Sequence, residues 1–284
     1  MLEIDHDLHV HTYLSACCGD PDNQRPAKIL ARAEELGLRT IGFADHLWVN
    51  PDLEPSNWYR PQDESQIARL RADLAVVSTS ARVLVGCESE TIAPGKFGIT
   101  REMAEQLDFV LLPCNHLHML GFVEQPASGR PRDVAEHLLR LFRSAVESGL
   151  ATAIPHPFTA PGFMDRFDAL VASVSDAEFL DVCGLAAERG VALEITRGFV
   201  PPAPGPDRPS WSLETPLRFL GLARQAGCKF TFGSDAHCFA DVGSVADIRP
   251  IVDALDLTRD DVAPVARGAS AQETDAHPAE PRPS

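Results

Sequence analysis

Short apolar runs alternate with amphipathic segments along most of the chain, and this alternation restricts the possible folds more than any other feature. About seven runs have the length and composition of buried strands, the first at residues 2–10 and the last at residues 229–233. Segments between them, such as residues 132–148, repeat apolar residues at helical spacing. Strands that alternate with helices predict a parallel α/β architecture. At 284 residues, a closed (β/α) barrel fits the length better than an open sheet.

Histidines and carboxylates gather where the predicted strands end. Seven of the ten histidines lie at or just after the carboxyl end of a strand: His9, His11, His46, His116, His118, His156 and His237. Glu88, Glu194 and Asp235 occupy the same kind of position. In a (β/α) barrel these ends meet at one face, which is where such enzymes carry their chemistry.

A metal centre explains this gathering better than separate local roles do. A single histidine could as well be an ordinary hydrogen-bonded or surface residue as a metal ligand. The same holds for the His9-Val10-His11 pair taken alone. Many imidazoles at one mouth would repel each other when protonated and would lack partners when neutral. Divalent cations bind imidazole nitrogen and carboxylate oxygen together. The whole set therefore predicts bound metal ions.

The composition argues against several classes of protein. Lysine and arginine number 25 against 41 aspartates and glutamates, a net charge of −16, which opposes capture of long nucleic acid or of an anionic membrane. We find neither a basic-apolar leader nor an apolar run of about 18 residues, so we expect no membrane span. Seven cysteines without a C-x-x-C pair indicate free thiols and a cytoplasmic location.

The sequence predicts one domain and a tail. Residues 1–265 carry the alternating strands and helices, and no G-x-G-x-x-G or P-loop motif occurs among them to indicate a nucleotide-binding doubly wound fold. Residues 266–284 are rich in proline, alanine and glutamate and have little apolar bulk. Such a composition predicts a disordered tail.

The strand-end residues also occur in the order of a known set of motifs. The motifs are Asp7-Leu8-His9-Val10-His11, Ala44-Asp45-His46, Gly86-Cys87-Glu88, Asn115-His116, Pro155-His156-Pro157 and Gly233-Ser234-Asp235-Ala236-His237. In this order they resemble the motifs of the PHP (polymerase and histidinol phosphatase) family, from residue 7 to residue 237. The resemblance implies a distorted (β/α)₇ barrel with two or three divalent metal ions (Zn, Mn or Fe) that hydrolyses phosphate esters.

The resemblance also implies how the metals are shared. One metal would be held by two histidines and two carboxylates: His9, His11, Glu88 and Asp235. A second would share Glu88 and be held by His116 and His156. A third would be held by His46 and His237.

The loop after His11 departs from the family's pattern, which usually supplies a further histidine or aspartate ligand for the third metal. Cys17 lies six residues after His11 and is the nearest candidate, with Cys18 or Asp20 as substitutes. A thiolate ligand would favour Zn²⁺ over Mn²⁺ at that position.

Several neighbouring residues have possible supporting roles. Glu194 could hold the second nitrogen of a ligand histidine, and His118 is better read as a substrate contact or a support than as a ligand. Arg197 is a candidate phosphate clamp, because guanidinium groups pair with phosphate oxygens, although it also fits an exposed loop. Trp48, Trp58 and Tyr59 could line a pocket, although aromatic residues in a long loop more often pack locally.

The expected reaction is hydrolysis of a small phosphomonoester by metal-activated hydroxide. Histidinol phosphate and nucleotide or sugar phosphates are candidate substrates, and a small phosphodiester is an alternative. Asp235 or His237 would handle protons, unless a metal-bound water does so. An amidohydrolase acting on a C–N or C–O bond also uses H-x-H on its first strand, but its usual strand-end lysine is not evident here. A non-catalytic metal-dependent scaffold would require a missing ligand.

Overall fold

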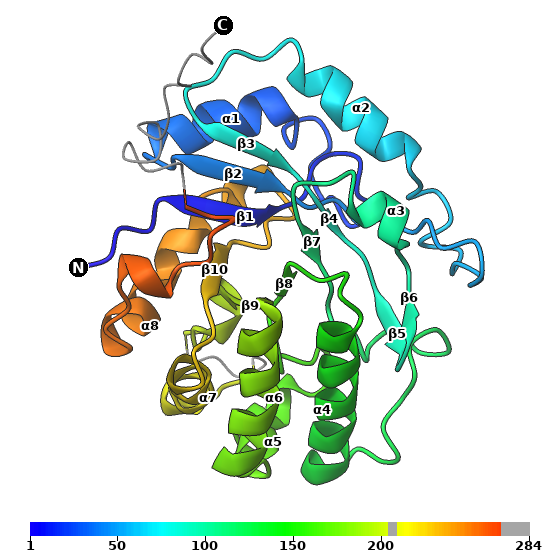
Figure 1. Ribbon diagram of the computed structural model, residues 1–284. Coiled ribbons are helices and arrows are strands. Elements are labelled where there is room, and N and C mark those ends of the chain that lie inside the picture. Colours follow the sequence, from blue (N-terminus) through cyan, green and yellow to red (C-terminus); the bar gives the residue numbers. More distant parts are fainter. Residues whose placement is uncertain (204–208, 268–284) are drawn as a thin grey trace, which may run out of the picture.

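Two parallel sheets form the centre of the computed structural model, which describes residues 1–203 and 209–267 (Figure 1). The first sheet has the order β1-β2-β3, with bounds His6–Val10, Thr40–Phe43 and Arg82–Val85. The second has the order β10-β9-β8-β7-β4, with bounds Phe230–Gly233, Ala192–Thr196, Ala153–Ile154, Val110–Leu111 and Cys87–Glu88. Neighbouring strands are parallel in both sheets, so the predicted parallel α/β architecture is confirmed.

The two sheets are linked at both edges without merging into one continuous ladder. Only Gly86 separates β3 from β4, so the chain leaves the first sheet and enters the second at this residue. A Cβ on Gly86 would lie 2.5 Å from the ring of Phe109, which explains why glycine stands at the crossing. At the other edge, a single bridge between Val10 and Ala236 connects the end of β1 to the chain after β10. The hydrogen bonds thus establish two parallel sheets, and the closed barrel that the sequence predicts stays a prediction.

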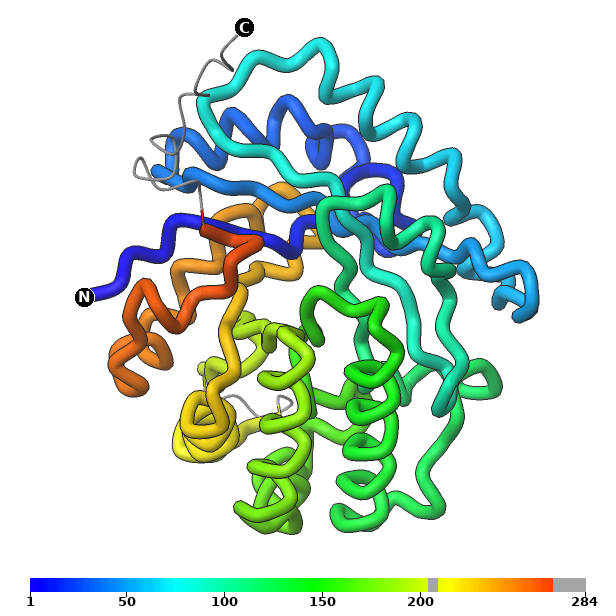
Figure 2. Tube along the Cα trace, viewed as in Figure 1, coloured from blue at the N-terminus to red at the C-terminus, as the bar shows by residue number. Residues whose placement is uncertain are grey.

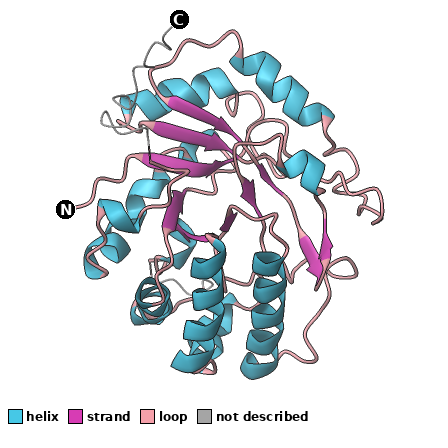
Figure 3. Cartoon of the chain, in the orientation of Figure 1, coloured by secondary structure: helices cyan, strands magenta, loops and turns pink. Residues whose placement is uncertain are grey.

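Helices flank both sheets (Figures 1 and 3). Beside the first sheet lie α1 (Pro26–Glu35) and α2 (Ser65–Leu74). Beside the second lie α4 (Pro131–Glu147), α5 (Phe167–Ala172), α6 (Asp176–Arg189) and α7 (Glu214–Gln225). The remaining elements are α3 (Arg101–Ala104), α8 (Arg249–Ala254), the antiparallel hairpin of β5 (Thr91–Ala93) and β6 (Lys96–Phe97), and short 3₁₀ turns at Met164–Arg166, Arg197–Phe199, Phe239–Asp241, Ser244–Ile248 and Arg259–Asp261. Among the described residues, no helix has the length and apolarity needed to cross a membrane.

Local sequence explains where the long helices begin and end. Pro131 opens α4 in the first turn, where its missing N–H costs nothing, and Val134, Leu138 and Leu141 repeat along its buried face. Ser175 caps α6 through a reciprocal capping box with Glu178. Gly190 ends α6 in the left-handed conformation, with φ of 68°.

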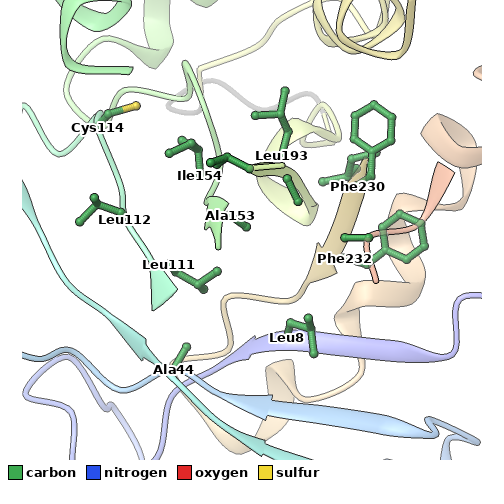
Figure 4. Packing of buried hydrophobic residues seen from close by; sticks show 14 of the residues in the cluster. Leu8, Ala44, Leu111, Leu112, Cys114, Ala153, Ile154, Leu193, Phe230 and Phe232 are labelled. Atoms are coloured by element: carbon green, nitrogen blue, oxygen red, sulfur yellow. The ribbon is translucent and has the colours of Figure 1, made fainter. Parts of the chain in front are cut away.

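Apolar side chains of the strands pack together in one buried core cluster. Figure 4 shows this packing, to which Leu8 of β1, Leu111 of β7, Ile154 of β8, Leu193 of β9 and Phe232 of β10 contribute. Each of these side chains is at most 1% exposed. Burying one such side chain contributes about 1.5–3 kcal/mol. The core therefore fixes the strand ends, and with them the residues that follow each strand.

The last described segment returns to the amino-terminal end of the strands (Figure 2). Val262 forms a bridge to Phe230, and Arg259 pairs with Asp5 at 3.0 Å. Ala266, the first residue of the expected tail, is buried. Residues 268–284 of that tail lie outside the described residues.

Candidate metal centre

The residues predicted to bind metal lie together beyond the carboxyl ends of the strands. They come from both sheets and from the loop after β1: His9, His11, Cys17, His46, Glu88, His116, His156, Asp235 and His237. Their donor atoms form groups within which every pair lies no more than 4.8 Å apart.

The first group contains His9, His11, Glu88 and Asp235. The Nε2 atom of His9 lies 3.4 Å from Glu88 Oε2 and 3.3 Å from Asp235 Oδ1. The Nε2 atom of His11 lies 3.5 Å and 3.3 Å from the same two oxygens. His9 Nε2 is also buried without a hydrogen-bond partner, which is costly unless a cation accepts its lone pair.

The second group contains Glu88, His116 and His156. Glu88 Oε1 lies 3.2 Å from His156 Nε2 and 3.8 Å from His116 Nε2. Because Glu88 Oε2 faces the first group, the two oxygens of one buried carboxylate face two different groups. This is the arrangement that a carboxylate bridging two metals requires.

The third group contains His11, Cys17, His46 and His237, so His11 belongs to two groups. Among the three loop residues that the sequence offers, the structure brings Cys17 to the histidines. Asp20 instead accepts hydrogen bonds from the Asn23 amide at 3.0 and 3.1 Å. Cys18 belongs to none of the groups found among the described residues.

Acceptors behind the cluster hold the second nitrogens of several histidines. His9 Nδ1 lies 3.0 Å from Glu194 Oε1, as the sequence predicts for Glu194. His116 Nδ1 lies 2.7 Å from Glu90 Oε2. A carboxylate only accepts, so each Nδ1 donates a proton to it, and Nε2 is the nitrogen that faces the cluster.

Two further histidines are oriented by neutral acceptors. His11 Nδ1 lies 3.2 Å from Ser15 Oγ, whose own proton is donated to Asp45 Oδ1 at 2.7 Å. His237 Nδ1 donates to the main-chain oxygen of Asp235 at 2.7 Å. Both contacts leave Nε2 free.

Sequence reasoning missed Glu90, Ser15 and Asp45 as supporting residues. Glu90 stands two positions after Glu88, and this spacing in extended chain was the available signal for a shared face. The contacts of Ser15 with His11 and Asp45 depend on the loop's path, so the sequence carried no comparable signal for them.

Burial and nearby charges shift the pKa values of the cluster in opposite directions. Burial alone would lower the pKa of His9, but Glu194, Asp235 and Glu88 raise it well above its ordinary value. Burial alone would also lower the pKa of His116, but Glu90 raises it to about 9. Burial would raise the pKa of Glu88, and the imidazoles around it hold it well below its usual range.

The pKa of the Cys17 thiol is lowered in the same way as the pKa of Glu88. Burial would raise its pKa, but the imidazoles of His11, His237 and His46 lower it to about 3. The cluster therefore contains anionic oxygen and sulfur donors among imidazoles, which is a donor set suited to divalent cations.

Strained backbone and one close approach support the cluster. His156 and Asp235 have positive φ values of 33° and 56°, which are uncommon outside glycine. A Cβ on Gly233 would lie 2.2 Å from Glu194 Oε1 and 2.6 Å from His9 Cβ. Only glycine lets β10 approach these two side chains so closely.

Two cavities flank the cluster and share His116, His156 and Asp235. The larger has a volume of about 700 Å³ and is lined by Arg197 and Trp211, among others. The guanidinium of Arg197 pairs with Asp241 at 3.4 Å and with Asp247 at 3.3 Å. Arg197 is thus on the wall of the larger cavity, held by two carboxylates.

The smaller cavity, of about 450 Å³, is lined by Cys17, His118, Trp58 and Tyr59, among others. His118 is exposed and belongs to none of the metal groups of the described residues, so its supporting or substrate-contacting role stays a prediction. Tyr59 is buried, and its hydroxyl donates to Glu90 at 3.2 Å. Trp58 and Tyr59 therefore line a pocket, whereas the buried Trp48 packs against Tyr59 and Phe122.

Known proteins resemble the chain along most of its length, although no family model matches it. A protein named probable phosphatase of Aliivibrio fischeri (strain MJ11) is 25% identical over 261 residues, which are 92% of this chain and 89% of the relative. A probable phosphatase of Vibrio atlanticus (strain LGP32) is 26% identical over 247 residues, 86% of this chain and 82% of the relative.

Solved structures share the fold of this chain. One of them is the histidinol phosphate phosphatase of Lactococcus lactis subsp. lactis Il1403 complexed with zinc, L-histidinol and phosphate. The match has a TM-score of 0.54 at 19% identity and covers 90% of this chain and 95% of that chain. The resemblance that the sequence predicts is confirmed by this match and by the two relatives.

Proposed function

We propose that the chain is a metal-dependent phosphatase of the PHP type that hydrolyses a small phosphomonoester. The observation that carries the proposal is Glu88, whose two oxygens face separate groups of histidines. The names of both bacterial relatives and the match to a histidinol phosphate phosphatase bear out the prediction of a phosphoric ester hydrolase.

We infer that the two sheets are parts of one distorted barrel, formed by a single domain over residues 1–265. The continuity of β3 with β4 across Gly86 supports this inference at one edge. The Val10–Ala236 bridge supports it at the other. In such a barrel the cluster lies at the face where chemistry takes place.

The residues of the cluster fit two or three divalent metal ions. His9, His11, Glu88 and Asp235 would hold the first, Glu88, His116 and His156 the second, and Cys17, His46 and His237 the third. The unpartnered Nε2 of His9 and the protonated Nδ1 atoms behind the cluster support this assignment. When bound, such ions supply acidified water and positive charge toward phosphoryl oxygens.

The chain's own residues would position the substrate and move protons. Arg197 lines the larger cavity, and its guanidinium would bind phosphoryl oxygens while Asp241 and Asp247 hold it in place. Asp235 borders both cavities and His237 borders the smaller one. Both residues could therefore take up or deliver a proton near a substrate held between the cavities.

Two cavities of about 700 and 450 Å³ suit a small molecule such as histidinol phosphate or a nucleotide or sugar phosphate. A small phosphodiester is a second candidate, because the cavities on either side of the shared residues could hold its two arms. We also propose a cytoplasmic location, which the seven free cysteines support.

The structure does not favour the amidohydrolase alternative. The usual strand-end lysine of such an enzyme would lie close to the metals. The three lysines Lys28, Lys96 and Lys229 all lie in the described part of the chain, and none lines either cavity beside the cluster.

The test is metal analysis combined with a phosphate-release screen. The screen covers histidinol phosphate, nucleoside monophosphates, sugar phosphates and small diesters. We expect two or three equivalents of metal, together with phosphate release from at least one monoester. Tight metal binding without phosphate release, but with hydrolysis of amides or lactones, would reject the proposal.

A further inference from the structure

We propose that Cys17 makes the third group a zinc site, chemically distinct from the two groups that share Glu88. The inference rests on the proposed function only in taking the cluster to be a metal centre. It concerns which metal the group of His11, Cys17, His46 and His237 holds.

The loop after β1 fixes Cys17 against the cluster. Ala16 N–H donates to Gln62 Oε1 at 2.9 Å, Cys18 N–H to Ser15 O at 3.0 Å, and Gly19 N–H to His237 O at 2.9 Å. The residues on both sides of Cys17 are therefore tied to fixed acceptors. Cys17 is half-buried and lines the smaller cavity, and its sulfur lies within 4.8 Å of donor nitrogens of the three histidines.

Two of the three histidines of this group are already oriented. Ser15 Oγ holds Nδ1 of His11, and the main-chain oxygen of Asp235 holds Nδ1 of His237. The Nε2 atom of each is thus free to bind metal. The group offers imidazole nitrogen and thiolate sulfur, whereas each group around Glu88 includes carboxylate oxygen.

The donor set decides the preference for metal. Thiolate and imidazole together suit Zn²⁺, whereas Mn²⁺ and Mg²⁺ prefer oxygen ligands. His11 has one free nitrogen and lies in two groups, so it serves one metal at a time. The third site then has either three nitrogens and sulfur, or two nitrogens, sulfur and an open position. Both are ligand sets that zinc adopts in proteins.

Cobalt binding tests the proposal, because Co²⁺ reports its ligands by absorption. Metal-free full-length protein is titrated with Co²⁺ and its spectrum recorded. We expect a near-ultraviolet thiolate-to-cobalt charge-transfer band, its loss in Cys17→Ser and its retention in the neighbouring control Cys18→Ser. A Cys17→Asp variant is expected to keep the metal stoichiometry while losing the band. A band that persists in Cys17→Ser, or no band in the wild type, would overturn the proposal.

A second measurement needs no variant. Protein saturated with Mn²⁺ is treated with iodoacetamide before and after one equivalent of Zn²⁺, and the modified cysteines are mapped by mass spectrometry. We expect Zn²⁺ to protect Cys17 and to leave Cys18 reactive; equal labelling of Cys17 with and without Zn²⁺ would contradict the proposal. Neither readout involves turnover. A thiolate band without phosphate release would therefore reject the proposed phosphatase and leave the zinc site standing.

Discussion

Glu88 joins the parts of the centre at the residue scale. Its Oε2 faces His9, His11 and His46, while its Oε1 faces His116 and His156. Opposite charges on all sides keep this buried carboxyl ionised, with a pKa well below its ordinary range. One side chain thus sets the spacing between the groups on either side of it.

Asp235 is the second carboxylate on which turnover should depend. Its Oδ1 lies 3.3 Å from both His9 Nε2 and His11 Nε2, and its backbone is strained. We predict that Asp235→Asn abolishes phosphate release while the circular dichroism spectrum stays unchanged, because an amide is a poor metal ligand and cannot take a proton. The exposed Asp22→Asn is the control and should keep full activity. Retained activity in Asp235→Asn would remove this residue from the centre.

Glu90 acts through His116 and not by direct contact with substrate. We predict that Glu90→Gln weakens metal binding or activity by about 10–100-fold, because the acceptor that orients His116 is altered. Calorimetric titration with Zn²⁺ and a phosphate-release assay measure the two effects. The exposed Glu105→Gln should behave like the wild type. Equal metal affinity in both variants would show that Glu90 does not position His116.

At the scale of elements, close packing between β9 and β10 places Glu194 behind His9. We predict that Gly233→Ala destabilises the protein by about 1–3 kcal/mol and lowers metal affinity, because a methyl group would overlap Glu194 and His9. Urea unfolding measures the stability. Gly184→Ala in α6 is the matched control: a Cβ there meets no atom within 4 Å, and the change should stabilise the helix by about 0.5–1 kcal/mol. An unchanged midpoint for Gly233→Ala would contradict this account.

The sequence predicts which residues follow the strands better than it predicts which distant residues they contact. Apolar runs that end in histidine or carboxylate locate His46, Glu88 and His156 without a structure, because the ends of parallel strands must meet. The contact between His9 and Glu194 joins residues 185 positions apart, and only the folded sheet shows which histidine Glu194 supports. The hairpin of β5 and β6 carries no strong alternation and was not foreseen.

The same limit applies to the loop after β1. Hydrogen bonds from the main-chain N–H groups of Ala16, Cys18 and Gly19 decide that Cys17 faces the histidines. Sequence spacing alone left Cys17, Cys18 and Asp20 open, because loop conformation depends on distant acceptors such as Gln62.

At the scale of the whole molecule, buried His6 ties the first sheet to the second. Its Nε2 accepts the Phe232 N–H at 3.0 Å, and burial lowers its pKa from 6.5. Just below pH 6.5, His6 binds a proton in the unfolded chain but not in the folded chain. The free energy of unfolding therefore falls as the pH falls.

We therefore predict that His6→Gln flattens the dependence of unfolding free energy on pH below about pH 6.5. Urea unfolding of the metal-free wild type and variant at several pH values measures the difference between them. An identical slope in the two proteins would show that His6 titrates alike in the folded and unfolded states.

The proposed function requires that metals bound around Glu88 support hydrolysis of phosphomonoesters. The most direct measurement is phosphate release from histidinol phosphate and other small monoesters by chelator-treated protein, before and after Zn²⁺ or Mn²⁺ is added back. We predict that the metal-free chain releases no phosphate, that added metal restores phosphate release, and that added metal does not restore it in Glu88→Gln. Release that is independent of metal, or metal uptake that restores no release from any monoester, would contradict the proposed function.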